Sequence, residues 1–248
     1  MWLNLSKIEI LALEQFCKGS LDAGQLAQKL DKKSSFISRV LKKLQEKGLV
    51  TRSGREISLS IAAHAQAFKK LHDSRPNAKI EEWLLGNSMS ALLVLTSSSD
   101  GTEMKLLENE AGCSRPTLFK VLRLLRSAGI VSKVGKKIII TDNFVSEFAQ
   151  NYANALENIL LADANGHNVA IRVRKHVIVR TDAKEVPSLF SETGINLLVK
   201  KGLVAIQTTY NDYYFNLDRI KRNPGIEEAF IHALLLSAKD PSPFAPKS

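Results

Sequence analysis

Two segments of this chain, 81 residues apart, carry the same arrangement of apolar and glycine positions. In each, four apolar residues at i, i+3, i+4 and i+7 predict one buried face of an α-helix that a glycine ends. These residues are Ile37, Val40, Leu41, Leu44 and Gly48 in the first segment and Leu118, Val121, Leu122, Leu125 and Gly129 in the second. A pattern repeated at a fixed offset predicts two copies of one structural unit.

Each repeated helix is preceded by two shorter helical patterns and followed by a predicted hairpin. The earlier helices are expected at 6–16 and 22–30, and again at 89–95 and 104–111. Residues 49–52 and 57–59 are typical of two strands that turn at Ser53-Gly54, and the hairpin recurs around Gly135. Three helices followed by a hairpin describe a winged helix-turn-helix, so the sequence predicts two of these domains in tandem.

The expected fold class is α+β, with the two winged helix-turn-helix domains followed by a small α+β domain. At 248 residues the chain is long enough for more than one domain. Pro76 breaks a helical pattern and marks a hinge at 75–77. We therefore expect domains at 1–75, 76–162 and 163–239, and a flexible, proline-rich tail at 240–248.

The positive charge of the chain is concentrated in these two segments. The formal net charge is +10, but residues 31–55 alone carry eight Lys and Arg against two acids. Residues 115–137 carry seven Lys and Arg and no acid. Localised positive charge on a helix-hairpin segment is typical of a surface that binds nucleic acid.

The first repeated helix resembles the recognition helix of MarR-type and related archaeal and bacterial transcription regulators. The resemblance rests on the run ISRVLKKLQEKGLV at residues 37–50, and both units, 5–61 and 87–141, are similar to that winged helix-turn-helix. It implies binding to double-stranded DNA. Ser114 is expected to cap the second helix. Lys33 occupies the equivalent position in the first unit, and we expect Ser34 to cap there instead.

The residues expected to contact DNA lie on the outward faces of the two helices and on the hairpins. The helices would read base edges in the major groove, and the hairpins would hold phosphates or enter a minor groove. For Phe36, contact with a thymine methyl and packing on the second helix are both open. The set is Ser34, Ser35, Phe36, Ser38, Arg39, Lys42, Lys43, Arg52 and Arg55 in the first unit, and Arg115, Pro116, Thr117, Lys120, Arg123, Lys133, Lys136 and Lys137 in the second.

A long helix is predicted at Asn143–Leu161, with an apolar stripe on one side. The stripe consists of Phe144, Phe148, Tyr152, Leu156 and Ile159. Two interpretations are open: the stripe packs within the chain, or it forms a homodimer interface, as in regulators that this chain resembles.

The C-terminal third has a different pattern, in which short strands alternate with helices. Strands are expected at 169–173, 176–180, 203–208 and 213–217, with a turn at 210–212 and helices at 187–201 and 226–237. Residues 193–202, 213–215 and 228–232 are similar to a domain that follows winged helices in AbiEi-type antitoxins and archaeal regulators. This domain is the expected site of a protein partner or a small-molecule effector.

The sequence offers no catalytic constellation, and we expect neither an enzyme nor a cofactor or metal. No apolar run is long enough to cross a membrane, and Glu9 follows Met1 too closely for a signal peptide. Cys17 and Cys113 are interpreted as buried thiols of a cytoplasmic protein. Tyr210, Tyr213 and Tyr214 fit either a hairpin core or a stacking site.

Four cations, too, have two interpretations: a solvated strand edge or a second phosphate-facing patch. They are Arg172, Arg174, Lys175 and Arg180.

Three functions are compatible with the sequence. The leading one is a sequence-specific DNA-binding transcription regulator, in which two units in one chain would act as a pseudo-dimer on adjacent half-sites. The alternatives are an antitoxin-type autoregulator and a module in which winged helices bind protein.

Overall fold

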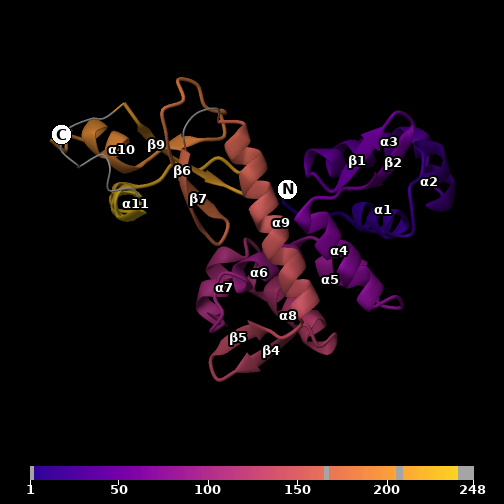
Figure 1. Cartoon of the computed structure of the whole chain (residues 1–248). Coiled ribbons are helices and arrows are strands. Elements are labelled where there is room, and N and C mark those ends of the chain that lie inside the picture. Colours follow the sequence, from indigo (N-terminus) through magenta and orange to yellow (C-terminus); the bar gives the residue numbers. More distant parts are fainter. Residues whose placement is uncertain (1–2, 165–167, 205–208, 240–248) are drawn as a thin grey trace. The chain divides into compact units, whose positions relative to one another are not determined.

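The computed structural model describes residues 3–164, 168–204 and 209–239. The chain divides into two compact units, which are described separately: Leu3–Leu156, and a unit formed mainly by residues from Glu157 onward. The helix α9 (Asn143–Ala162) contributes residues to both units (Figure 1).

The first unit begins with three helices and a hairpin. They are α1 (Lys7–Cys17), α2 (Ala23–Lys29), α3 (Ser34–Glu46), β1 (Val50–Ser53) and β2 (Glu56–Leu59), followed by α4 (Ala63–Ser74). Ser6 and Asp22 start α1 and α2 with capping boxes, in which each side chain accepts a hydrogen bond from the backbone three residues on. The predicted helices and hairpin are present.

The same order of elements follows in the second half of this unit. It comprises α5 (Ile80–Leu84), α6 (Asn87–Leu95), β3 (Thr102–Glu103), α7 (Met104–Glu110), α8 (Arg115–Ser127), β4 (Val131–Val134) and β5 (Lys137–Ile140), and then α9. The bounds of α8, β4 and β5 equal those of α3, β1 and β2 plus 81. The short helix α5 has no counterpart among the predicted elements.

The offset of 81 also holds in the strand pairing. Leu21 forms an antiparallel bridge with Ile57, and Thr102 pairs with Ile138, so both partners are shifted by 81. Both hairpins turn at a glycine with positive φ, 61° at Gly54 and 60° at Gly135. This left-handed conformation disfavours residues with a Cβ, which explains why glycine recurs there.

Two details of the predicted helices are wrong. Lys33, not Ser34, is at the N-cap of α3, and no side chain caps that helix. Ser34 is the first helical residue, because the turn after α2 already places Lys33 in an extended conformation. In α8, Leu118, Leu122 and Leu125 are buried, but Val121 is only half-buried.

The apolar stripe of α9 also differs from the prediction. Phe148, Tyr152 and Leu156 are fully buried, whereas Phe144 is 41% exposed and Ile159 is half-buried. Small residues continue the buried face instead. Val145, Ala149 and Ala153 lie one position away from the predicted stripe and are buried. The buried face is therefore rotated toward these residues.

The second unit contains a four-stranded antiparallel sheet with the order β6-β7-β9-β8. Its elements are β6 (Asn168–Val173), β7 (His176–Thr181), β8 (Ser191–Glu192), α10 (Gly194–Lys200), β9 (Asn211–Asn216) and α11 (Ile226–Lys239). The two helices pack together through Leu198, Ala229 and Ala233.

Two predictions for this unit are wrong. The helix expected at 187–201 forms only from Gly194, because Ser191 and Glu192 pair with β9. The turn expected at 210–212 does not form, since Asn211 and Asp212 pair with β7. Of the strand expected at 203–208, residues 205–208 lie outside the described part of the chain, as does the predicted tail at 240–248.

Among the described residues, no helix combines the length and the apolar character that a membrane crossing needs. Cys17 and Cys113 are half-buried, not fully buried as expected, and they are not joined in a disulfide. Burial raises the pKa of the Cys17 thiol to about 12, so this side chain stays protonated.

Candidate nucleic-acid interface

The outward face of α3 is polar, cationic and exposed. Its apolar face, formed by Ile37, Val40, Leu41 and Leu44, is buried against the rest of the unit. The helix therefore turns its other side to solvent. The exposed residues on that side are Ser34, Ser35, Ser38, Arg39, Lys42 and Lys43. Phe36 is half-buried, with the Arg39 guanidinium 5.7 Å from the centre of its ring.

The outward face of α8 is more cationic. Arg115, Pro116, Lys120 and Arg123 are exposed, and Thr117 is half-buried like Phe36 at the equivalent position. The Arg115 Nε lies 3.0 Å from the Glu108 Oε1, and its guanidinium lies 5.6 Å from the centre of the Phe119 ring. Arg115 is thus partly engaged within the protein.

The hairpins carry the remaining predicted cations. Arg52, Arg55, Lys133, Lys136 and Lys137 are all exposed on them. Arg52 is oriented by its own turn, because its Nε donates a hydrogen bond to the Gly54 carbonyl at 3.0 Å. All the residues expected to contact DNA are thus accessible, with Phe36 and Thr117 the least exposed.

Apart from Arg115, these predicted cations make no ion pair with any residue that the structure describes. The carboxylates of the unit pair elsewhere, as in the contacts of Glu9 with Lys47 and of Glu147 with Lys70. Cations that lack an acidic partner are available to neutralise phosphates. The positive charge of residues 31–55 and 115–137 is therefore largely uncompensated at the surface.

A hollow of about 700 Å³ lies between α8 and the first strand of its hairpin. Phe119 and Leu122 contribute apolar surface to it, and four cations complete much of its lining: Lys120, Arg123, Arg126 and Lys133. Arg126 and Phe119 were not among the predicted contacts. Phe119 precedes Arg123 by four residues and Arg126 follows it by three, and this helical spacing is the sequence signal that could have placed both on the same face.

Burial and hydrogen bonds hold the C-terminal end of α3 in place. Lys47 follows the last residue of α3, and its Nζ lies 2.7 Å from the Glu9 Oε1 of α1. The same Nζ donates to the Asn4 carbonyl at 2.9 Å, and the His64 Nε2 lies 2.9 Å from the Lys47 carbonyl. Three segments are thereby tied to the end of α3. No sequence pattern singled out Lys47 for this role.

The four cations of the β6–β7 hairpin form neither of the surfaces considered from the sequence. Arg180 is buried and makes two hydrogen bonds to Asp212, at 2.8 and 3.1 Å. Lys175 is buried 3.0 Å from Asp218, and the Arg172 Nε lies 2.7 Å from Glu157. These charges are compensated inside the unit, so a phosphate-facing patch is not formed there. Arg174 takes the turn of the hairpin with a φ of 59°.

The three tyrosines do not form a shared stacking site. Tyr214 is buried and stacks on His232, with 5.7 Å between ring centres and 8° between planes. Tyr213 is half-buried and tilted against Phe190. Tyr214 and Tyr213 are neighbours in a strand, so their side chains point to opposite faces of the sheet.

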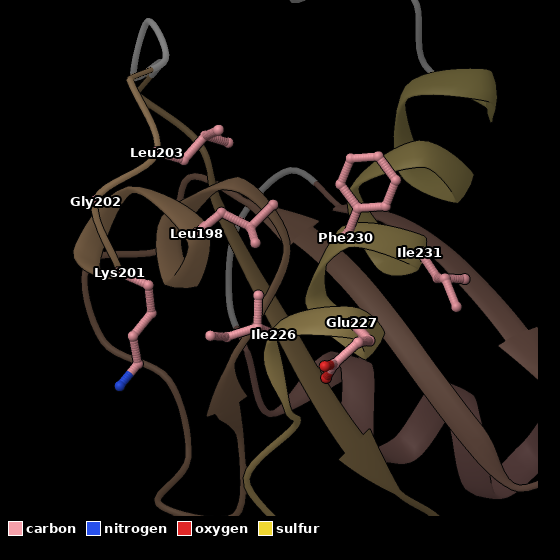
Figure 2. A pocket seen from close by; sticks show the side chains of 8 residues that line it. All are labelled: Leu198, Lys201, Gly202, Leu203, Ile226, Glu227, Phe230 and Ile231. Atoms are coloured by element: carbon pink, nitrogen blue, oxygen red, sulfur yellow. The ribbon is translucent and has the colours of Figure 1, made fainter.

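A second hollow, of about 710 Å³, lies between α10 and α11. Figure 2 shows Leu198 and Ile226 between Leu203 on one side and Phe230 on the other, with the Lys201 amino group directed away from them. Gly202, Glu227 and Ile231 complete the lining. An apolar hollow with few polar groups is typical of sites for small apolar ligands or partner side chains.

The described residues contain no group of three or more His, Cys, Asp and Glu side chains that could hold a metal ion. His64 and His232 are both buried, and burial lowers the pKa of each below its ordinary value. His64 contacts the Lys47 carbonyl, and the His232 Nδ1 lies 2.8 Å from the Thr193 hydroxyl. Both imidazoles thus have structural partners.

Residues 7–52 match the family model described as bacterial regulatory protein, ArsR family. The matched segment runs from α1 to the first strand of the hairpin, and it includes all of α3. This part of the chain is therefore similar to a helix-turn-helix regulator domain, which indicates DNA-binding transcription regulation. No curated protein and no solved structure matches the chain. The MarR-type and AbiEi-type resemblances stay predictions.

Proposed function

We propose that this protein is a sequence-specific transcription regulator that binds double-stranded DNA through two winged helix-turn-helix domains. In this proposal α3 and α8 are the recognition helices, and the hairpins β1–β2 and β4–β5 are the wings. The observation that carries it is the placement of exposed cations without acidic partners at equivalent positions of both helices: Arg39 with Lys120, and Lys42 with Arg123.

The match to the ArsR family supports the proposal for the first domain. For the second domain, the support is the offset of 81 in helix bounds, hairpin bounds and strand register. The hollow beside α8 adds Arg126 to the predicted cations Lys120, Arg123 and Lys133, and these four surround an exposed Phe119. Such a surface suits a phosphate backbone next to base edges.

Salt dependence of duplex binding tests this function. If about eight phosphates are neutralised, the slope of log K against log salt concentration will be about −7. The measurement is fluorescence anisotropy of the full-length protein on duplexes selected from a random pool. Binding without any dependence on salt, or selection that enriches no sequence, would contradict the proposal.

Binding to a protein partner, instead of to DNA, is a competing function for the first winged helix. Its basic segment contains Glu46, and Glu56 follows directly, whereas residues 115–137 contain no acid. Variants of the full chain discriminate the two, because removal of α3 cations should weaken DNA binding only if that helix contacts DNA. An antitoxin-type autoregulator would also bind DNA, and a neighbouring gene for a toxin would favour it.

A protein partner or small-molecule effector at the C-terminal domain would have its best site in the hollow between α10 and α11. The support is its apolar lining and the exposed Phe230 and Ile231 of α11. An apolar ligand that binds there would be detected as a rise in melting temperature with ligand concentration. The variant Phe230→Asp, which changes an exposed residue of the lining, should abolish that rise.

A further inference from the structure

Contacts between the two repeats of the first unit join equivalent helices. Adding 81 to the bounds of α4 gives 144–155, a range inside α9. The Phe68 and Phe148 rings meet edge to face with 5.5 Å between their centres. The rings of His64 and Tyr152 lie 6.2 Å apart, and the Lys70 Nζ lies 2.8 Å from Glu147.

These pairs show that α4 and α9 run antiparallel. As the residue number rises from His64 to Lys70 in α4, the partner number falls from Tyr152 to Glu147 in α9. In the numbering of the first repeat, Phe148 is equivalent to position 67 and contacts position 68. The two helices therefore cross near the same point of each repeat.

The segments before the first helix of each repeat also meet. Leu5 forms a parallel bridge with Leu85, which is equivalent to position 4, and the Gly86 amide donates to the Leu5 carbonyl at 3.3 Å. Two separate contacts, between α4 and α9 and between Leu5 and Leu85, thus join equivalent segments of the two repeats. A contact in which the same patch of each copy is buried is isologous, and isologous contacts arise from a two-fold axis.

A two-fold relation requires reciprocal contacts, and the middle of the helix pair is consistent with them. His64 is equivalent to Val145, and Tyr152 is equivalent to Leu71. The contact of His64 with Tyr152 therefore has Leu71 with Val145 as its reciprocal pair, and both of these residues are fully buried. The relation is approximate, because Ile61, which is equivalent to Asp142, is 93% exposed while Asp142 is buried against Arg75. The repeats are thus related by an approximate two-fold axis, not by a simple translation.

The approximate two-fold axis determines the relative orientation in which the two recognition helices meet DNA. The outward side chains of each helix determine which bases it recognises. Two-fold related domains meet half-sites of inverted orientation. The outward residues differ between the repeats, however: Ser35 is equivalent to Pro116, Phe36 to Thr117, and Ser38 to Phe119. The cations at Arg39 and Lys120, and at Lys42 and Arg123, agree in charge.

From these observations we infer that one chain binds one duplex that carries two different half-sites in inverted orientation. The inference rests on the proposed function and adds the target and its stoichiometry. The apolar surfaces that pair the repeats are buried within the chain, since Phe68, Phe148 and Tyr152 are fully buried. The two recognition helices of a functional pair are therefore supplied by a single chain.

The arrangement of half-sites tests the inference. The two halves of the motif selected by the full-length protein, A and B, are placed in four duplexes: A and B inverted, A and B as a direct repeat, A with inverted A, and B with inverted B. We expect the first to bind tightest, by about tenfold over each of the others, because a wrong half-site makes fewer base contacts. Native mass spectrometry should show one chain per duplex.

Matched variants at equivalent positions locate each helix on its half-site. Lys42→Ala in α3 should relax base preference only in one half of the motif, and Arg123→Ala in α8 only in the other. Two chains per duplex, equal binding of the direct repeat, or both variants acting on the same half would overturn the inference while leaving DNA binding intact. Failure to bind any duplex would instead remove the proposed function, and the inference with it.

Discussion

Lys47 and Glu9 form a buried ion pair with 2.7 Å between the Nζ and Oε1 atoms, and each side chain is only 3% exposed. Burial would raise the pKa of Glu9, but the Lys47 charge and hydrogen bonds from Lys47 and Ser6 outweigh it and lower that pKa. The pair joins the start of α1 to the end of α3. The equivalent residues of the second repeat, Ser90 and Ala128, carry no charge.

Removing one partner of this pair should destabilise the first unit strongly. We expect Lys47→Met to lower the free energy of unfolding by about 3–5 kcal/mol, because it leaves a buried carboxylate without its cation. The double variant Glu9→Leu with Lys47→Met should recover most of that decrease. Urea unfolding of the full chain, followed by a probe in the first unit, measures both. A double variant no more stable than Lys47→Met would contradict this account.

Acid should weaken the same pair. Since the folded state lowers the pKa of Glu9, its stabilising contribution is present above the ordinary value of 4.5. It is lost as the pH falls below 4.5 and through the folded-state pKa. Unfolding free energies measured from pH 6 downward should therefore converge for the wild type and Lys47→Met, as the carboxylate that needs the cation disappears. A constant difference between the two proteins would rule this out.

His64 should add a second pH dependence nearer neutrality. Burial lowers its pKa below 6.5, against a hydrogen bond with the Lys47 carbonyl that raises it. The folded state thus favours the neutral ring. The contribution of the neutral ring to the free energy of unfolding should be fully present above pH 6.5. It should fall as the pH drops toward the folded-state pKa, by up to about 1.4 kcal/mol per pH unit.

The variant His64→Gln isolates this effect, because Gln can donate to the Lys47 carbonyl and does not titrate. Its free energy of unfolding should vary less between about pH 7.5 and 5.5 than that of the wild type. His232, whose pKa is also lowered, serves as the comparison in the other unit, since His232→Gln should leave the first unit's pH dependence unchanged. Identical slopes for wild type and His64→Gln would exclude the ring as the source.

Cations of the α8 face and of its wing should contribute to DNA binding in different ways. Arg123→Ala should cost about 1–3 kcal/mol and relax one base preference if the guanidinium contacts a guanine. Replacing Lys136 and Lys137 by Ala should weaken binding to all sequences equally and make the salt slope shallower by about 1 for each phosphate that is no longer neutralised. Anisotropy titrations at several salt concentrations measure both. Lys69→Ala, which removes an exposed cation on α4, is the matched control and should change neither.

Arg180 should matter for the stability of the second unit and not for DNA. It makes two hydrogen bonds to Asp212, whose Oδ2 also accepts from the Ile195 amide at 3.1 Å. We expect Arg180→Leu to leave Asp212 buried without its cation and to cost about 3–5 kcal/mol. Arg180→Lys should rescue little, because an ammonium cannot make the paired hydrogen bonds. Thermal unfolding monitored in this unit checks the decrease, and an unchanged melting temperature would speak against it.

Local patterns were enough to predict much of the first unit. The i, i+3, i+4, i+7 stripes placed α3 and α8, the shorter helical patterns at 6–16 and 22–30 placed α1 and α2, and Gly54 and Gly135 placed the turns. These predictions hold because each depends only on residues that are close together in the sequence. The exposed cations followed from the same periodicity, since a buried stripe fixes which side faces solvent.

The errors arose where distant residues decide local structure. Ser191 and Glu192 are drawn out of a predicted helix by pairing with β9, and Asn211 and Asp212 are drawn out of a predicted turn by pairing with β7. Arg180 and Lys175 have the composition of surface cations, but each meets a carboxylate that lies 32 or 43 residues further along the chain. Local propensity is weak beside such pairing.

The amino-acid sequence alone established that a helix with a cationic face and a hairpin occurs twice, because periodicity and turn glycines are properties of short segments. The packing of the folded chain was needed to establish that α4 lies antiparallel to α9 and that Lys47 is withdrawn from the basic surface to meet Glu9. Both depend on which apolar faces pack against each other and which charged groups are buried as a pair. That choice is made by residues as far apart as Phe68 and Phe148, and no local pattern contains it.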